Sequence, residues 1–250
     1  MENLFSGKTA VVTGAGSGIG QAAALLYAQQ GAKVIVSDIN EAGGIETVTL
    51  IKKAGGEASF IKTDVSDAAQ CKALADETIN LYGSLDIAFN NAGISGEMNP
   101  VADMSIEGWL KVINVNLNSV FYCMKYQLPC MVKHGSGVII NMSSILGKVA
   151  FANSPAYVAA KHGVVGLSKN AAVEYAKQGI RVNAIGPAFI NTPLLSVLDD
   201  NIKNALTQMH PLGRFGEAKE VAELVIWLSS DKASFVTGNY YAVDGGYLAV

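Results

Sequence analysis

Short runs of apolar and β-branched residues alternate with longer helical patterns from one end of the chain to the other. The short runs predict seven strands, at Thr9–Thr13, Lys33–Ser37, Ser59–Lys62, Asp86–Asn90, Gly137–Met142, Arg181–Ile185 and Tyr240–Val243. Helices are expected at about residues 18–30, 41–54, 67–82, 105–133, 155–178 and 217–230. This alternation is typical of right-handed βαβ crossovers. It predicts an α/β fold, a Rossmann-type doubly wound parallel sheet of seven strands flanked by helices on both faces.

No linker, internal repeat or low-complexity stretch interrupts the pattern, so residues 1–250 are expected to form a single domain. The one long irregular stretch covers about residues 186–216, with a short helix near 199–209. A connection of this length in a compact domain is usually a binding loop or a lid. We therefore expect it to contact the substrate.

Composition narrows the classes of function. Half of the 250 residues are hydrophobic and 16% are charged, which suits a sheet buried on both faces and further surface buried between subunits. The net charge of −3 and the presence of only two arginines argue against binding to nucleic acid or to an anionic membrane. No apolar run is long enough to span a membrane and no leader pattern follows Met1, so a cytoplasmic location is expected. The three cysteines form no CxxC pair and the three histidines show no ligand spacing, so no metal site is expected.

A glycine-rich segment lies between the first predicted strand and the first predicted helix. Residues 13–20 read TGAGSGIG. Glycines let a backbone turn tightly and approach a pyrophosphate, and the helix N-terminus supplies free N–H groups and a positive dipole. The spacing is GxxxGxG rather than the more common GxGxxG. Its position after the first strand makes it a strong indication of dinucleotide binding.

Asp38 ends the second predicted strand, 18 residues after Gly20. A carboxylate at this place can accept hydrogen bonds from the adenosine ribose and would repel a 2′-phosphate. The neighbours Ser37 and Ile39 are not basic, and neither is Ser17 in the glycine loop. The charges therefore favour NAD over NADP. The alternative is that Asp38 only caps the following helix.

Polar residues of the kind needed for hydride transfer follow the middle strands. Tyr157 and Lys161 are four residues apart on one predicted helix face, and a nearby ammonium can lower the pKa of a phenol. Ser144 lies 13 residues before Tyr157, just past the fifth strand. The segment Asn90–Gly93 follows the fourth strand at the same edge, and Asn116 lies in the helix that starts near residue 105. Carboxyl ends of parallel strands are where such sheets bind ligands.

Taken together, these motifs resemble those of the short-chain dehydrogenase/reductase family, in its branch of roughly 250 residues. Within that family the chain is similar to NAD-dependent secondary-alcohol dehydrogenases and carbonyl reductases. The resemblance covers the chain from Thr13 to Gly246. It rests on TGAGSGIG at 13–20, Asp64-Val65, NNAG at 90–93, Asn116, Ser144, Tyr157-xxx-Lys161 and Asp244-Gly245-Gly246.

The resemblance implies a role for each matching residue. Tyr157 would be the general acid/base and Ser144 would hydrogen-bond the substrate oxygen. Lys161 would lower the pKa of Tyr157 and bind the nicotinamide ribose, and Asn116 would hold a water of a proton relay through its helix backbone. Asp64 and Val65 would flank the adenine, Asn91 and Gly93 would line the cofactor cleft, and Thr192 would contact the carboxamide. The expected cofactor-binding set is Gly14, Ser17, Gly18, Ile19, Gly20, Asp38, Ile39, Asp64, Val65, Asn91, Ala92, Gly93, Tyr157, Lys161, Pro187, Ile190 and Thr192.

Some assignments stay open at this level. Ser143 or Ser144 could cap a turn, and only the spacing to Tyr157 selects Ser144. Asn116 could be an ordinary polar helix residue, and its choice over Asn114 rests on the family pattern. The sequence also departs from that pattern, with Pro187-Ala188 where the family usually has Pro-Gly. Alanine there puts the path of the following loop in doubt, and with it the Thr192 contact.

The expected substrate pocket is apolar and contains no arginine or lysine, which favours a hydrophobic ketone or secondary alcohol, aryl or alicyclic. Several of these side chains could instead only pack the loop against the core. A homo-oligomer is expected, and the resemblance implies a tetramer. The pocket residues are Ile94, Ile145, Leu146, Phe151, Ala188, Phe189, Leu194 and Leu195.

Three other functions agree less well with these residues. A 3-oxoacyl-carrier-protein reductase usually prefers NADPH and needs basic surface for its carrier, so Asp38 and the scarcity of arginine count against it. A non-catalytic dinucleotide-binding protein would have no need to keep Ser144, Tyr157 and Lys161. A lyase of the same fold without a cofactor would be expected to lose the intact glycine loop.

Overall fold

The computed structural model describes residues 3–196 and 199–250, without the side chains of Leu194 and Ser196. As predicted, seven strands form one parallel sheet, and their order is β3-β2-β1-β4-β5-β6-β9. Their bounds are β1 Thr9–Thr13, β2 Lys33–Asp38, β3 Glu57–Lys62, β4 Ile87–Asn90, β5 Gly137–Met142, β6 Ile180–Pro187 and β9 Tyr240–Val243. The order reverses between β1 and β4, and ligands bind such sheets at that point.

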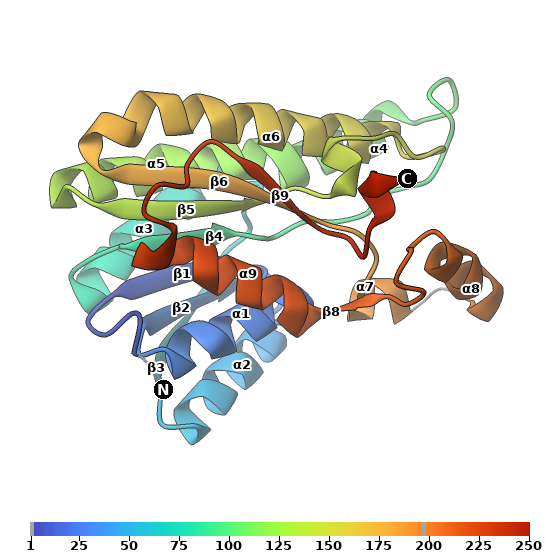
Figure 1. Ribbon diagram of the computed structural model, residues 1–250. Coiled ribbons are helices and arrows are strands. Elements are labelled where there is room, and N and C mark those ends of the chain that lie inside the picture. The colour runs from blue at the N-terminus through green and yellow to red at the C-terminus, as the bar shows by residue number, and fades with distance from the viewer. Residues whose placement is uncertain (1–2, 197–198) are drawn as a thin grey trace.

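Helices cover both faces of this sheet (Figure 1). Helices α1, α2 and α9 lie on one face, and α3, α4, α5 and α6 lie on the other. Polar side chains start several of them, because Asn40, Asp67 and Ser105 accept hydrogen bonds from the first free N–H groups of α2, α3 and α4. The bounds are α1 Gly18–Gln29, α2 Glu41–Lys53, α3 Ala68–Tyr82, α4 Ile106–Ile113, α5 Ser119–His134, α6 Pro155–Tyr175, α7 Pro193–Ser196, α8 Asp200–Gln208 and α9 Ala218–Ser229.

The core has one large cluster on each side of the sheet. Tyr27 of α1 and Leu228 of α9 pack against one face, and Leu74 of α3, Met131 of α5 and Val164 of α6 pack against the other. The strands are nearly continuous apolar runs because both of their faces are covered. No described helix combines the length and the apolar character needed to cross a membrane.

Two predicted elements differ in the structure. The helix expected at 105–133 is divided, because a π-helical turn at Asn114–Asn118 separates α4 from α5. The stretch expected to be irregular at 186–216 contains α7 and α8, as well as strands β7 (Ile190–Asn191) and β8 (Gly216–Glu217), which pair with each other. The pairing brings both ends of this segment together. Helix α8 agrees with the short helix expected at 199–209.

Candidate active site

The glycine loop lies at the reversal of strand order, against the segment that follows β4. The side-chain amide of Asn91 donates to the carbonyl oxygens of Thr13 and Gly14, at 2.9 and 3.2 Å. The Thr13 hydroxyl accepts from the backbone N–H groups of Asn91 and Ala92. Two motifs almost eighty residues apart are thereby held as one unit at the carboxyl edge of the sheet.

Glycine is required where the loop is closest to its surroundings. A Cβ added at Gly20 would overlap the carbonyl oxygen of Gly14, and one at Gly14 would lie 2.9 Å from the Cα of Ala92. Gly14 and Gly18 both have positive φ, a backbone conformation that residues other than glycine rarely adopt. A side chain at Gly14 or Gly20 would therefore push the loop away from the end of β4.

The N-terminus of α1 is free to bind an anion. Its N-cap residue, Ser17, is exposed and makes no side-chain capping bond, and the first turn contains no acidic residue. The first N–H groups and the positive end of the helix dipole are thus available to a pyrophosphate. Ile19 is half-buried beside them.

Asp38 lies at the end of β2 with both carboxylate oxygens engaged. One oxygen accepts from the backbone N–H of Gly16 at 2.8 Å, and the other accepts from the N–H of Asn40 at 2.8 Å. The N-cap of α2 is Asn40, whose side chain accepts from the N–H of Gly43, so Asp38 is not the cap. The next residue, Ile39, is 62% exposed and leaves its side chain free to contact a ligand.

Asp64 and Val65 follow β3, next to Asp38. The N–H of Thr63 donates to the Asp38 carbonyl, which continues the β2–β3 pairing to this point. Asp64 accepts from the N–H and the hydroxyl of Ser66, and Val65 is buried. Their position extends the edge defined by the glycine loop and Asp38.

The two serines after β5 face different groups. The Ser143 hydroxyl is buried and donates to the Lys161 carbonyl at 2.9 Å. The Ser144 hydroxyl accepts from the N–H of Leu146 at 3.2 Å, and it lies close enough to the Tyr157 phenol to lower the pKa of that group. Ser144 therefore caps a short turn and also lies beside the tyrosine, and its catalytic role stays a prediction.

Tyr157 and Lys161 lie on one face of α6, with the Lys161 Nζ 5.4 Å from the centre of the Tyr157 ring. Lys161 is 3% exposed, and its Nζ donates to the Met142 carbonyl at 2.9 Å. Burial lowers the pKa of Lys161 to about 8. Burial also raises the pKa of Tyr157, while the hydrogen bond with Ser144 lowers it. The net shift of the Tyr157 pKa is upward, so desolvation outweighs the lowering that was expected from the ammonium.

Asn116 lies inside the π-helical turn and is fully buried. Its side chain accepts from the N–H of Ile94 at 2.8 Å and donates to the carbonyl of Ile94 at 2.7 Å. A Cβ added at Gly93 would lie 3.2 Å from the Asn116 Oδ1 and 3.7 Å from the Lys161 Nζ. Asn116, Gly93 and Lys161 are therefore neighbours, whereas Asn114 bonds to Asn118. π-Helical turns occur often at functional sites.

The segment after β6 lies across the glycine loop. The Thr192 methyl would be 3.3 Å from a Cβ at Gly18. Pro187 and Ile190 are buried beneath it. Ala188 is not among the residues with positive φ, and its N–H donates to Val243. Alanine therefore fits this path, and the departure from Pro-Gly leaves Thr192 beside the loop.

The residues expected to line the substrate pocket are only partly gathered. Phe151 and Phe189 make an edge-on ring contact at 6.1 Å. Ile145 and Leu146 are buried and Leu195 is half-buried, while the Leu194 side chain lies outside the described residues.

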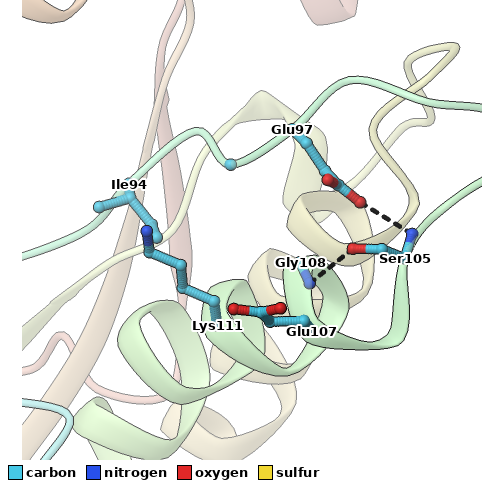
Figure 2. Close-up of a pocket in the computed structure, with 7 residues that line it drawn as sticks. Ile94, Glu97, Ser105, Glu107, Gly108 and Lys111 are labelled. Atoms are coloured by element: carbon cyan, nitrogen blue, oxygen red, sulfur yellow. Dashed lines mark hydrogen bonds between the residues drawn. The ribbon is translucent and has the colours of Figure 1, made fainter.

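Ile94, Ala188 and Phe189 line two separate hollows. One, of about 400 Å³, is lined by Ile94 and by charged residues of the loop and α4, among them Glu97 and Lys111 (Figure 2). The other, of about 110 Å³, is lined by Ala188 and Phe189, and also by Arg214, whose guanidinium is paired with Glu220. Neither is lined by Ser144, Tyr157 or Lys161.

Sequence patterns did not indicate the buried His210. Its imidazole Nδ1 bonds to the Leu206 carbonyl at 2.9 Å, and its Nε2 accepts from the Phe189 N–H at 3.4 Å. The ring packs edge-on against Phe189, Phe215 and Tyr247. Only long-range packing brings these residues together, and no local motif predicts it. Within the described residues no cluster of His, Cys, Asp and Glu could hold a metal ion.

Known proteins resemble this chain over its whole length. A family model described as Enoyl-(Acyl carrier protein) reductase matches residues 14–248. Cyclohexanol dehydrogenase from Acinetobacter sp. (strain SE19) is 48% identical over 247 residues, covering 99% of this chain and 97% of that protein. A 3-oxoacyl-[acyl-carrier-protein] reductase from Thermotoga maritima is 40% identical, covering 97% and 98% of the two chains.

A solved structure supports the same relationship. The crystal structure of levodione reductase superimposes with a TM-score of 0.94 at 37% identity, covering 98% of this chain and 99% of that one. With the family model and the relatives spanning both the glycine loop and the Ser144-Tyr157-Lys161 group, the chain belongs to the short-chain dehydrogenase/reductase family and is an oxidoreductase.

Proposed function

We propose that this chain is an NAD(H)-dependent enzyme that interconverts an alicyclic secondary alcohol and its ketone. The observation that carries the proposal is the arrangement of Ser144, Tyr157 and Lys161, in which the Ser144 side chain lowers the pKa of the Tyr157 phenol and 5.4 Å separates the Tyr157 ring centre from the Lys161 Nζ. The similarity to cyclohexanol dehydrogenase supports a saturated ring as the substrate class. The apolar Phe151–Phe189 contact offers a surface of matching character.

The residues at the carboxyl edge fit a nicotinamide dinucleotide. The close contact of Gly20 with the Gly14 carbonyl leaves the loop backbone without side chains, and the α1 N-terminus is open to the pyrophosphate. The Asp38 carboxylate would accept from the ribose hydroxyls and repel a 2′-phosphate, which favours NAD over NADP. When bound, such a cofactor supplies or accepts the hydride exchanged with the substrate carbon.

The proton on the substrate oxygen is handled by the protein. In ketone reduction the Tyr157 hydroxyl donates its proton to the carbonyl oxygen, and the Ser144 hydroxyl donates a hydrogen bond to the same oxygen as negative charge develops there. In alcohol oxidation Tyr157 takes the proton back. A Lys161 pKa of about 8 keeps its ammonium charged near neutral pH, where it stabilises the phenolate.

Lys161 would also restore the proton of Tyr157 from solvent. Its Nζ lies beside Gly93 and Asn116, and the π-helical turn changes the backbone bonding around Asn116. We propose that a water held at this turn links Lys161 to solvent. Asn116 would thereby act on the proton supply rather than on the substrate.

A 3-oxoacyl-carrier-protein reductase is the second candidate, because such reductases are among the relatives. That activity calls for NADPH and for a basic surface to hold an acidic carrier. The negative charge of Asp38 would repel the 2′-phosphate of NADPH, and the net charge of −3 does not favour a basic surface.

The test follows consumption of NADH or NADPH by the purified protein with cyclohexanone, acetophenone, a 2-keto acid and an acetoacetyl thioester. The proposal expects faster turnover of cyclohexanone with NADH, and loss of that turnover in Tyr157→Phe. Turnover of the acetoacetyl thioester alone, with NADPH, would support the acyl-carrier reductase. Dinucleotide binding without turnover of any ketone would contradict both.

The proposal also covers the oligomeric state and the cellular location of the protein. We propose a homotetramer in the cytoplasm, and the exposed Phe121 and Trp109 on α5 and α4 supply apolar surface for subunit contacts. Three free cysteines suit a reducing compartment. Light scattering after size-exclusion chromatography tests the tetramer, for which a monomeric mass would be the contradicting result.

A further inference from the structure

The last strand of the sheet reaches the candidate active site through a tyrosine. Tyr240 begins β9, and its hydroxyl donates to the carbonyl oxygen of Ser144 at 2.9 Å. The same carbonyl accepts from the N–H of Gly147 at 2.8 Å. Both acceptor positions of this carbonyl are therefore used, which fixes the peptide plane that follows Ser144.

The space for the Tyr240 hydroxyl is provided by Gly186 of β6. A Cβ added at Gly186 would overlap the hydroxyl and the ring carbon that bears it. The Lys148 Nζ lies 5.0 Å from the centre of the Tyr240 ring, so two neighbouring segments contact this half-buried side chain. Burial and the negative charge of Asp244 raise the pKa of Tyr240, so the phenol keeps the proton that it donates.

The position of the Ser144 hydroxyl depends on this anchor. The bonds of the hydroxyl to the backbone are longer, at 3.2 Å from the Leu146 N–H and 3.5 Å to the Pro187 carbonyl. The shorter bonds are those to the Ser144 backbone carbonyl. Ser144 is thus oriented through its main chain, while its side chain stays available to Tyr157 and to a substrate oxygen.

We propose that Tyr240 is a positioning residue, which holds the Ser144 backbone so that the serine hydroxyl points at Tyr157 and the substrate oxygen. The inference rests on the proposed function, because it gives Tyr240 a task only if Ser144 acts on the substrate. It adds a residue from the end of the chain, 96 positions after Ser144, to the machinery of the reaction.

The test compares Tyr240→Phe with Tyr241→Phe. The next residue along β9, Tyr241, points to the opposite face of the sheet, where its ring packs edge-on against Trp227, so it is a matched control. Loss of one hydrogen bond is expected to lower kcat for alcohol oxidation about three- to tenfold in Tyr240→Phe, with the KM for NAD unchanged. Tyr241→Phe is expected to keep the wild-type kcat.

The pH dependence separates positioning from a loss of stability. The Ser144 hydrogen bond lowers the pKa of Tyr157, so a misplaced serine lets that pKa rise and moves the pH–rate profile of Tyr240→Phe to higher pH. Lys161 on the same helix is the charged group beside the phenol, and it is unchanged in both variants. A lower melting temperature with an unmoved profile would overturn the proposal.

A second variant keeps the test independent of the phenol itself. Gly186→Ala should displace the Tyr240 hydroxyl, lower kcat and move the pH–rate profile to higher pH, as Tyr240→Phe does. The double variant should have a kcat no lower than that of Gly186→Ala alone. Equal kcat and equal pH profiles in the wild type and Tyr240→Phe would overturn the inference while leaving the function intact. Full activity of Ser144→Ala would instead overturn the proposed role of Ser144, and the inference with it.

Discussion

The carboxylate of Asp38 accepts a hydrogen bond from the backbone N–H of Gly16 at 2.8 Å, which ties the end of β2 to the glycine loop. The side chain is thereby held beside the loop that would contact the pyrophosphate. Its second oxygen is oriented by the N–H of Asn40. A negative charge fixed at this place is the basis of the proposed preference for NAD.

Replacing Asp38 by alanine is expected to lower kcat/KM with NADH about 10- to 100-fold, because hydrogen bonds to a charged group contribute about 1.5–3 kcal/mol. Activity with NADPH should rise relative to that with NADH, since the repulsion of the 2′-phosphate is removed. The exposed Asp76 on α3, replaced by Asn, is the control. An unchanged ratio of the two cofactors in Asp38→Ala would refute the assignment.

Gly20→Ala is expected to abolish dinucleotide binding, because its methyl group would overlap the Gly14 carbonyl and crowd the Asn91 amide. Overpacking of this kind costs about 1–3 kcal/mol of stability. Gly166→Ala is the matched control, because Gly166 lies in α6 with open space around it and gains about 0.5–1 kcal/mol of helix stability. Fluorescence titration with NADH measures both, and tight binding by Gly20→Ala would contradict the account.

The buried ammonium of Lys161 gives stability a defined pH dependence. Its pKa falls from 10.5 to about 8 on folding, so the unfolded chain binds the extra proton between these values. Stability should therefore rise with pH from about 8 to about 10.5, and the charged lysine costs roughly 3 kcal/mol below that window.

Lys161→Met should remove that cost. The variant is expected to be more stable than the wild type near pH 7, by up to roughly 3 kcal/mol, and to lose this advantage above about pH 10.5. It should also lose activity. Urea unfolding at several pH values measures the difference, and a variant destabilised equally at every pH would show that Lys161 is not held there as a desolvated cation.

Phe189 is expected to determine affinity for a ring-shaped substrate. Its ring meets those of Phe151 and His210, and the His210 Nε2 accepts from its backbone N–H. Phe189→Ala should raise the KM for cyclohexanol about tenfold and change that for 2-propanol little, because the lost apolar area matters only for the larger substrate. Phe235→Ala, at a fully exposed ring, is the control. Equal KM changes for both alcohols would remove Phe189 from the substrate surface.

The sequence predicts the sheet well because buried parallel strands are short apolar runs bounded by turns, and β5 and β9 have the predicted bounds. The π-helical turn around Asn116 was missed because one added residue in a turn barely changes the apolar spacing of a long helix. The β7–β8 pair, each strand two residues long, depends on a contact between distant segments.

The candidate site shows the same limit. The spacing between Ser144 and Tyr157 selects the serine whose side chain meets the tyrosine, and the neighbouring Ser143 bonds to the Lys161 carbonyl instead. No local sequence motif indicates the contacts of Tyr240 and His210, because their partners Ser144 and Phe189 are far away in the sequence and close only in the folded chain.

The central claim, that Tyr157 is the acid/base of an alcohol dehydrogenase, is tested most directly by measuring cyclohexanol oxidation and NADH binding in Tyr157→Phe. NADH is expected to bind with nearly wild-type affinity while kcat falls by at least about 100-fold, because the proton acceptor alone is removed. A kcat within about twofold of the wild type would contradict the claim.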